Sequence, residues 1–294
     1  MPFLVISPGL TASSKRRAIS PATLAAIDAI VKGAPRRPRP SGAMVWQLPK
    51  MTTKGREALE QVLLPLANAH QVDFAIVERP YRWQDYKVLA MDMDSTVITM
   101  ECIDEIADYC GKKAEVSAIT EAAMRGEIKD YAESLRRRVA LLEGLPAKVL
   151  KDVIRYRLKF TPGVKSLVAS ARAHGLHTLL VSGGFIQFTD FVSEKIGFMQ
   201  TRSNQLEIID GRLTGRLIGE IVDASVKAKT VREACRRLGV NPTAAITVGD
   251  GANDLKMMDV SGLSIAHRAK PAVAAQAMQA IRSGGLDNVL DWFE

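Results

Sequence analysis

The sequence predicts an α/β protein: a doubly wound parallel sheet with a helical cap insertion, preceded by a small α+β N-terminal domain. Three observations lead to this fold class. From residue 86 onward, short apolar runs alternate with helical stretches. A long helical, charge-rich segment interrupts this alternation after its first strand. Residues 1–85 carry a separate pattern of strands and helices, which ends in the polar, proline-containing stretch 78–85.

The composition describes a globular chain. Of 294 residues, 47% are hydrophobic and 24% are charged, which is enough to build a sizeable core. No apolar run approaches the length that spans a bilayer, and the N-terminus lacks a signal-peptide pattern, so we expect a cytoplasmic protein without a membrane partner. The three cysteines, Cys102, Cys110 and Cys235, form no C-x-x-C pair, which argues against a disulfide framework and a structural zinc site.

Residues 1–85 are expected to form a small β-α-β-α-β unit. Its predicted elements are strands at 3–6, 43–48 and 72–77 and helices at 21–31 and 52–69, with Ser20 and either Thr52 or Thr53 as N-caps. The outline resembles an ACT-like domain, one strand short. Such domains sense ligands or dimerise, so the resemblance implies a regulatory role or a homodimer formed through this region.

Positive charge is concentrated at the N-terminal end. The net charge of the chain is +8, and residues 1–80 account for +6 of it, with eleven Lys/Arg against five Asp/Glu. The proline-rich segment 32–40 holds four of these basic residues and is not expected to be helical. Such a segment could dock nucleic acid or an acidic surface. Because no aromatic residues interleave and no nucleic-acid motif accompanies it, a solvated basic loop is favoured and no nucleic-acid partner is expected.

The second region, residues 86–294, is expected to form the doubly wound sheet. Buried parallel strands are predicted at 88–91, 178–181, 245–248 and 263–266. The insertion from about residue 99 to 160 is too long for a simple crossover and predicts a helical cap over the strand ends. A β-hairpin is predicted at 206–218, with Asp210-Gly211 at its turn. In such sheets ligands bind beyond the carboxyl ends of the strands, where polar residues follow three of these four runs.

The first polar strand end carries two carboxylates. Asp92 and Asp94 follow the run 88–91 and stand two residues apart, so an extended backbone would direct both toward one pocket. Paired carboxylates of this kind can serve as a nucleophile and an acid/base. Taken alone, the motif is equally compatible with a pair of capping residues in a strand-to-helix loop.

Two later strand ends suggest a phosphate site and a cation site. Ser182-Gly183-Gly184 supplies a hydroxyl and unobstructed backbone N–H groups, as phosphate binding requires, although an ordinary turn would look similar. The segment 249–254 brings Asp250, Asn253 and Asp254, which are oxygen donors suited to a hard cation. It half-matches a dinucleotide fingerprint, but an aspartate occupies the position of the third glycine, so a nucleotide site is discounted.

Four segments in order resemble the motifs of the haloacid dehalogenase-like phosphatases, and most closely those members that act on phosphoserine. They are Asp92-Met-Asp-Ser-Thr96, Val181-Ser-Gly-Gly-Phe185, Ser225-Val-Lys-Ala-Lys-Thr230 and Gly249-Asp-Gly-Ala-Asn-Asp254. The resemblance covers about residues 86–294. Within the third segment, register with the family favours Lys227 over Lys229. The N-terminal 85 residues lie outside the resemblance.

The resemblance implies roles for the core residues. Asp92 would be the nucleophile that forms an aspartyl-phosphate, and Asp94 would act as acid and then as base. A Mg²⁺ ion would be held by Asp92, the backbone carbonyl of Asp94 and Asp250, although Mn²⁺ accepts the same octahedral oxygen site. Donors to the phosphoryl oxygens would be Ser182, the Gly183 N–H and Lys227. The metal-bound waters and Lys227 would be positioned by Asn253 and Asp254.

The resemblance also implies substrate contacts in the cap. Glu101 would pair with the substrate ammonium, and Arg138 would grip the carboxylate with two hydrogen bonds. Met124 and Tyr131 would add apolar contacts; the family usually has Phe at the position of Tyr131. The implied reaction is Mg²⁺-dependent hydrolysis of O-phospho-L-serine, the last step of serine biosynthesis.

Two other readings remain open from the sequence. One keeps the chemistry and changes the acceptor or the ester, for example phosphoryl transfer from phosphoserine to homoserine. The other treats the chain as a ligand sensor or nucleic-acid binder that uses residues 1–85 and retains a decayed catalytic domain. The intact carboxylates at Asp92, Asp94, Asp250 and Asp254 argue against decay.

Overall fold

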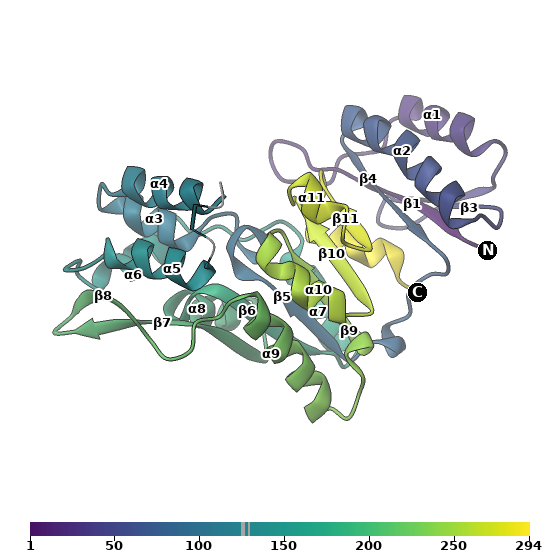
Figure 1. Cartoon of the computed structure of the whole chain (residues 1–294). Coiled ribbons are helices and arrows are strands. Elements are labelled where there is room, and N and C mark those ends of the chain that lie inside the picture. Colours follow the sequence, from purple (N-terminus) through teal and green to yellow (C-terminus); the bar gives the residue numbers. More distant parts are fainter. Residues whose placement is uncertain (125–126, 129) are drawn as a thin grey trace.

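The computed structural model describes residues 1–124, 127–128 and 130–294, apart from the side chains at 123 and 124, and it contains two β-sheets (Figure 1). The smaller, N-terminal sheet consists of β1 (Phe3–Pro8), β2 (Arg36–Pro38), β3 (Met44–Gln47) and β4 (Val72–Val77). Its order is β2-β3-β1-β4, and all neighbours are antiparallel. With the two helices below, this is the β-α-β-β-α-β arrangement of ferredoxin-like folds.

Helices α1 (Pro21–Val31) and α2 (Thr53–His70) pack on one face of this sheet. Their N-caps are Ser20 and Thr52, whose hydroxyls accept hydrogen bonds from the backbone N–H groups of Thr23 and Gly55. The core between helices and sheet includes Ile27, Leu63 and the fully buried Trp46.

The predicted N-terminal unit of three strands was wrong by one strand, because β2 lies in the basic segment expected to be a loop. All three residues of β2 are exposed, so the segment lacks the apolar alternation by which strands are predicted. β2 pairs only with β3, with Arg36 opposite Trp46, at the edge of the sheet. Pro38 is tolerated there because an edge strand need not donate every N–H group.

The larger sheet has the order β11-β10-β9-β5-β6-β7-β8. Its strands are β5 (Val88–Met91), β6 (His177–Phe185), β7 (Gln200–Ile209), β8 (Arg212–Ile218), β9 (Ala245–Gly249), β10 (Leu263–His267) and β11 (Gln279–Ile281). All neighbours are parallel except β7 and β8, which form the predicted hairpin. Positive φ angles at Asp210 and Gly211 produce its two-residue turn.

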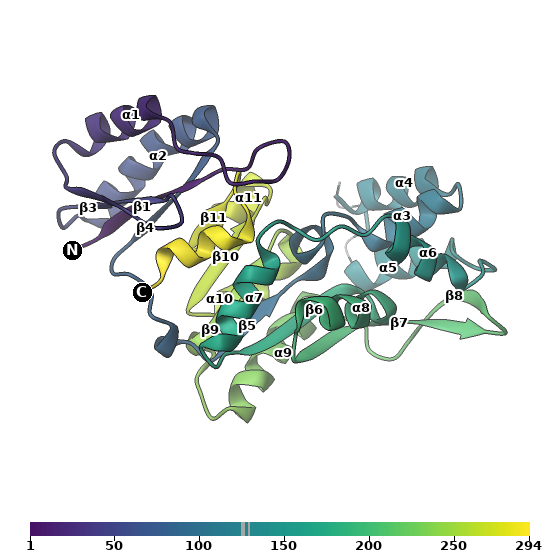
Figure 2. The same ribbon diagram turned by 180° about the vertical axis from the view of Figure 1, so that it is seen from behind.

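Helices cover both faces of this sheet. They are α7 (Val164–Ala173), α8 (Ile186–Ile196), α9 (Ala224–Arg237), α10 (Leu255–Val260) and the short α11 (Pro271–Ala274). Successive residues of β5 point to opposite faces: Val88 and Ala90 belong to the core with α9, and Leu89 and Met91 to the core with α7 and α8. Figures 1 and 2, which view the molecule from opposite sides, show α9 and α10 on one face and α7 and α8 on the other. The predicted doubly wound fold is confirmed.

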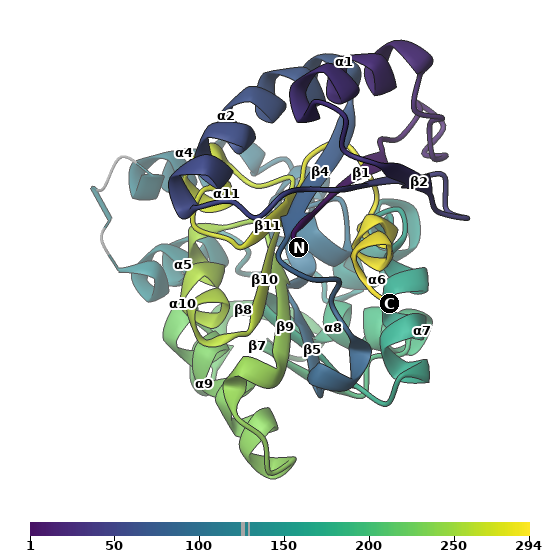
Figure 3. The ribbon, with the colours of Figure 1, turned by 90° about the vertical axis from the view of Figure 1, so that its right-hand side faces the viewer.

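In its described residues, the predicted cap insertion contains four helices: α3 (Cys102–Tyr109), α4 (Lys113–Met124), α5 (Tyr131–Ala140) and α6 (Lys148–Tyr156). The cap lies at the same end of the molecule as the β7–β8 hairpin, which contacts α5 (Figure 1). At the opposite end, edge strand β4 of the N-terminal sheet lies beside edge strand β11 of the large sheet (Figure 3). Among the described residues, none of the helices combines the length and the apolarity needed to cross a membrane.

Candidate active site

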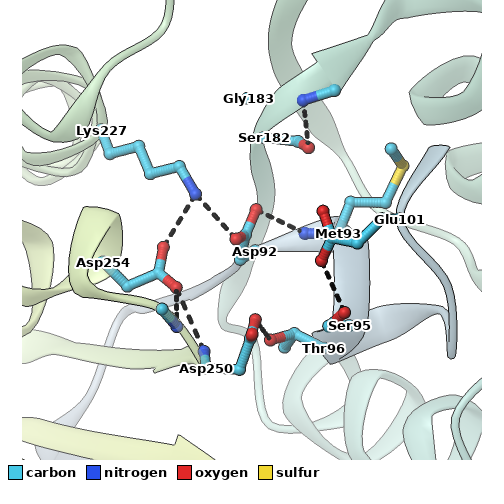
Figure 4. Close-up of polar contacts among 12 residues, drawn as sticks. Asp92, Met93, Ser95, Thr96, Glu101, Ser182, Gly183, Lys227, Asp250 and Asp254 are labelled. Atoms are coloured by element: carbon cyan, nitrogen blue, oxygen red, sulfur yellow. Dashed lines mark hydrogen bonds and ion pairs between the residues drawn. The ribbon is translucent and has the colours of Figure 1, made fainter. Parts of the chain in front are cut away.

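The candidate active site lies at the carboxyl ends of β5, β6 and β9, in the middle of the large sheet. From β5 the chain winds outward to β6 and β7 on one side and later fills β9, β10 and β11 on the other, so β5 and β9 flank the topological switch point. Figure 4 shows the side chains that converge there, among them Asp92 after β5, Ser182 in β6 and Asp250 after β9.

A tight turn at 93–97 shapes the end of β5. Asp92 Oδ1 accepts a hydrogen bond from the backbone N–H of Met93 at 2.7 Å, which fixes its carboxylate. Ser95 adopts a left-handed conformation with φ 55°, so the chain reverses within the motif. Thr96 then donates its hydroxyl to Asp250 Oδ1 at 2.9 Å and connects the turn to the end of β9.

Lys227 of α9 is fully buried and lies between two aspartates. Its ammonium nitrogen is 2.8 Å from Asp92 Oδ2 and 2.8 Å from Asp254 Oδ1. Burial by itself would lower the pKa of Lys227, but the carboxylates of Asp254 and Asp92 raise the pKa above its ordinary value, so the ammonium remains charged. Lys229, two residues later, is exposed. Lys227 is therefore the lysine that reaches the carboxylates.

Asp254 has both carboxylate oxygens occupied by the protein. Oδ1 faces Lys227, and Oδ2 accepts hydrogen bonds from the backbone N–H groups of Asp250 and Gly251, each at 3.1 Å. The carboxylate packs so closely against Gly249 that a Cβ atom there would lie 2.4 Å from Asp254 Cγ, which explains the glycine. Asp254 thus holds the loop and the lysine in position.

The carboxylate group fits a divalent cation. Ligand-capable oxygens of Asp92, Asp250 and Asp254 all lie within 4.8 Å of one another, and in the described part of the chain Lys227 is the cation paired with them. Burial raises the pKa of Asp92. The neighbouring carboxylates of Asp254 and Asp250 raise the pKa of Asp92 further, and the charge of Lys227 lowers it. Burial, then Asp254, raises the pKa of Asp250 to about 7. Among the described residues, Asp254 accepts three hydrogen bonds or ion pairs, Asp92 two and Asp250 one. Asp250 and Asp92 therefore keep more lone pairs for a hard cation than Asp254 does.

The Ser182–Gly184 segment forms the opposite wall of the site. Ser182 is fully buried, and its oxygen accepts a hydrogen bond from the Gly184 N–H at 2.9 Å, which leaves the hydroxyl proton available to a ligand. Asn204 of β7 donates to the Gly183 carbonyl at 2.8 Å and accepts from the Val222 N–H at 2.9 Å. Asn204 therefore fixes the orientation of the peptide unit between Gly183 and Gly184.

Asp94 is on the cap side of the site. Burial raises the pKa of Asp94 to about 8; the Glu101 carboxylate adds to this shift, and hydrogen bonds from Cys102 oppose it. A carboxyl group that is protonated near neutral pH can donate a proton and later accept one. The Cys102 thiol donates to Asp94 Oδ1 at 2.9 Å.

Two polar residues that the sequence predicts as substrate contacts, Glu101 and Arg138, belong to the cap, and a third cap residue lies near Arg138. Glu101 is exposed, and its Oε1 accepts a hydrogen bond from the Ser95 hydroxyl at 2.6 Å. Arg138 of α5 is half-buried and bonds the carbonyl of Ser134 in its own helix at 3.4 Å. Asp104 of α3 has a buried oxygen, Oδ1, for which the described residues supply no hydrogen-bond partner. Burial raises the pKa of Asp104 while the charge of Arg138 lowers it, so the two side chains lie within electrostatic reach.

Tyr131, at the start of α5, reaches the Ser182–Gly184 segment. A Cβ atom built on Gly183 would lie 2.2 Å from the Tyr131 hydroxyl oxygen, so the phenol occupies the space above that glycine. Burial raises the pKa of Tyr131 to about 12, and the hydroxyl stays protonated. Asn253 is half-buried, and its Oδ1 would lie 2.2 Å from a Cβ on Gly251. The side chain of Met124 lies outside the described residues.

Sequence reasoning missed four supporting residues: Thr96, Cys102, Asp104 and Asn204. Thr96 is the last residue of the first motif and Cys102 directly follows Glu101, so their positions in the sequence were an available signal. Asn204 carried no signal, because its contact depends on β7 lying beside β6.

The fold and this carboxylate–lysine group define the class. A family model described as haloacid dehalogenase-like hydrolase matches residues 89–259, and the chain belongs to this family. A phosphoserine phosphatase from Polaromonas sp. is 55% identical over 211 residues, which cover 70% of this chain and 89% of that relative. Within the hydrolase family, the chain therefore belongs with the phosphoserine phosphatases.

Two solved structures resemble nearly the whole chain. A HAD family hydrolase from Salmonella enterica serovar Typhi has a TM-score of 0.85 and 29% identity, and the match covers 100% of this chain and 99% of that one. A probable phosphoserine phosphatase from Vibrio cholerae has a TM-score of 0.78 and 34% identity, with 99% and 85% coverage. Both matches include the N-terminal sheet as well as the large one.

Proposed function

We propose that this protein hydrolyses O-phospho-L-serine to L-serine and phosphate through an aspartyl-phosphate on Asp92, with Mg²⁺ as cofactor, as the last step of serine biosynthesis. The observation that carries the proposal is the buried Lys227, which bridges Asp92 and Asp254 beside Asp250. The substrate is inferred from the relatives named phosphoserine phosphatase.

The proposed reaction has two displacements. In the first, an oxygen of Asp92 bonds to phosphorus, the bond from phosphorus to the serine oxygen breaks, and Asp94 gives that oxygen its proton. In the second, Asp94 takes a proton from water, which attacks the aspartyl-phosphate and releases Asp92. The raised pKa of Asp94, about 8, supports this alternation.

Side chains and backbone N–H groups that line the site would stabilise the negative charge on the phosphoryl group. The Ser182 hydroxyl, the Gly183 N–H and the Lys227 ammonium are the proposed donors to the phosphoryl oxygens. Asp92, Asp250 and the backbone carbonyl of Asp94 would hold Mg²⁺, which when bound neutralises the repulsion between the nucleophile and the anionic ester. Asp254 and Asn253 would support this arrangement.

The cap would select the amino acid part of the substrate. Glu101 is the proposed partner of the ammonium group, and Arg138 of the carboxylate. Tyr131 and Met124 would enclose the serine backbone. Asp104 is half-buried beside Arg138 and would orient its guanidinium.

For the rest of the chain, we propose that residues 1–85 form a regulatory or dimerisation domain, the latter through a homodimer, while residues 86–294 form the phosphatase domain. A cytoplasmic location stays a prediction. A chain starting near residue 84 that circular dichroism shows to be folded would test the division: full turnover with a lost serine response or lost dimerisation would support it, and lost turnover in the folded chain would refute it.

The direct test is phosphate release from L-phosphoserine, with and without Mg²⁺, by the wild type and Asp92→Asn, beside a panel of small phosphoesters. Metal-dependent turnover that prefers phosphoserine and is lost in the variant supports the proposal. Preference for another ester would overturn the roles of Glu101 and Arg138. Adding homoserine and analysing the products separates hydrolysis from phosphoryl transfer, the alternative left open by the sequence.

A further inference from the structure

Cys102 contacts the proposed acid/base but has no part in the reaction described so far. It begins α3 directly after Glu101, and its side chain is fully buried. Its thiol donates to Asp94 Oδ1 at 2.9 Å, and its backbone N–H donates to the same carboxyl group. A single residue therefore contacts the Asp94 carboxyl group twice, and its thiol is the donor to Oδ1.

The other carboxyl oxygen of Asp94, Oδ2, faces the Ser182–Gly184 segment. A Cβ atom built on Gly184 would lie 3.0 Å from Asp94 Oδ2 and 3.1 Å from Ser182 Oγ. Asp94 Oδ2 thus lies beside the Ser182–Gly184 segment, where the phosphoryl group is proposed to bind. The two oxygens of Asp94 have different surroundings: Oδ1 faces a thiol donor, and Oδ2 faces the reaction.

We propose that Cys102 is a positioning residue that fixes the Asp94 carboxyl group so that Oδ2 is the oxygen directed at the leaving group. This inference rests on the proposed function. As Asp92 bonds to phosphorus and the bond to the substrate oxygen breaks, the proton moves from Asp94 Oδ2 to that oxygen. Because Oδ1 accepts from Cys102, the carboxyl group is kept from rotating its proton away. In the second displacement the same oxygen receives the proton from water.

A purely structural role for Cys102 makes a different prediction. Cys102 packs in the main core with Ile103 and Ile106, so its replacement could loosen the cap generally. General loosening would slow every ester alike. Loss of orientation at Asp94 would slow only those esters whose departing oxygen needs a proton, because a nitrophenolate leaves without one.

The test compares Cys102→Val and Cys102→Ala, which lack a donor, with Cys102→Ser, which keeps one. kcat/KM is measured for L-phosphoserine and for a series of alkyl and aryl phosphates that the wild type hydrolyses, including p-nitrophenyl phosphate. This parameter reports the steps up to departure of the alcohol. We expect kcat/KM of Cys102→Val and Cys102→Ala to fall by about 30-fold on the alkyl esters and by less than about 3-fold on the nitrophenyl ester. Cys102→Ser should stay within about 3-fold of wild type on both.

Several outcomes would overturn the inference. If kcat/KM of Cys102→Val and Cys102→Ala fell equally on alkyl and aryl esters, Cys102 would have only a packing role. If kcat/KM on alkyl esters did not fall in Cys102→Val and Cys102→Ala, the thiol would have no role as a donor. The same conclusion would follow if Cys102→Ser lost as much kcat/KM as Cys102→Ala. If the wild type prefers an ester other than phosphoserine, the proposed substrate fails, but the dependence on the leaving group still decides the role of Cys102.

Discussion

Asp73 in the N-terminal sheet and Asp92 in the candidate active site are both buried aspartates, but their surroundings differ. Asp73 accepts four hydrogen bonds: from the backbone N–H groups of Arg282 (2.7 Å), Ser283 (2.9 Å) and Gly284 (2.7 Å), and from Asn288 Nδ2 (2.9 Å). Burial raises the pKa of Asp73, and these hydrogen bonds oppose the shift. Asp92 instead shares its space with two other carboxylates and Lys227.

The difference separates a structural joint from a reactive site. Asp73 is satisfied by neutral donors at the end of β11, and the nearby Gln279 side chain donates to the Ile76 carbonyl at 2.9 Å, so the edges of the two sheets are fastened together. The carboxylates around Asp92 keep free oxygens and repel one another. A protein tolerates such a group where a cation or a substrate will complete it.

Replacing the lysine of the reactive site should have the largest effect. Lys227→Met removes the ammonium that bridges Asp92 and Asp254, so kcat/KM for phosphoserine should fall by about 10³-fold or more. Lys229→Met, on the exposed face of the same helix, is the matched control and should stay within about 2-fold of wild type. Steady-state assays on both variants check this, and equal losses would contradict the assignment.

Replacing the joint residue should affect stability rather than chemistry. Asp73→Ala leaves three backbone N–H groups and Asn288 without their acceptor, and should lower the free energy of unfolding by about 3 kcal/mol. Asp85→Ala, which removes a surface ion pair with Arg82, should leave the free energy of unfolding nearly unchanged. Urea unfolding measures both. If folded Asp73→Ala lost turnover as Lys227→Met does, the contrast between the two regions would fail.

The contact between cap and core allows a smaller, coupled test. In Gly183→Ala the added methyl group would collide with the Tyr131 hydroxyl, so kcat/KM should fall by about 30-fold. Tyr131→Phe removes that oxygen, and the double variant should regain most of the loss, since the next ring atom would be 3.4 Å away. Tyr131→Phe alone is the control. A double variant as impaired as Gly183→Ala would show that the cap does not close on this glycine.

The smallest expected effect concerns pH and metal. The folded pKa values of Asp94 and Asp250, about 8 and about 7, lie above the unfolded value of about 3.9, so the folded metal-free protein binds more protons between these limits. Its stability should therefore fall as pH rises from about 4 to 8. Asp250→Asn should weaken this dependence and raise the metal-free Tm at pH 8 by about 2–4 °C.

Mg²⁺ provides the complementary measurement at the same site. At pH 8 it should raise the Tm of the wild type and leave that of Asp250→Asn unchanged, because the variant lacks a proposed ligand. Melting curves with chelator and with Mg²⁺ provide both comparisons. A variant that melts lower than the wild type without metal, or that still responds to Mg²⁺, would argue against the cation site.

Local signals in the sequence identified most elements of the fold. The Ser20 cap and Pro21 marked the start of α1, and the apolar runs at 88–91 and 72–77 matched β5 and β4 residue for residue. β2 was not predicted because all its side chains are exposed. β11 was not predicted because a strand of three residues carries little hydrophobic pattern. Neither strand could be found without knowing its neighbour.

The same distinction applies to the site. The sequence assigned Asp92, Lys227, Asp250 and Asp254 to one site because each belongs to a recognisable motif, and the structure brings the four side chains together. Asn204 and Asp73 were not found, because their partners lie far away in the sequence, as with Asp73 and Asn288, which are 215 residues apart. A polar residue acquires such a role only through the packing of strands, which no local pattern records.

The central claim, that Asp92 is the nucleophile, is tested most directly by acid-quenching the enzyme during turnover of phosphoserine labelled at the phosphoryl group and mapping the label by peptide analysis. The account predicts a labelled peptide that contains Asp92 in the wild type and no label in Asp92→Asn. Phosphate release by the wild type with the label on a different residue, or an Asp92→Asn variant that still turns over, would contradict it.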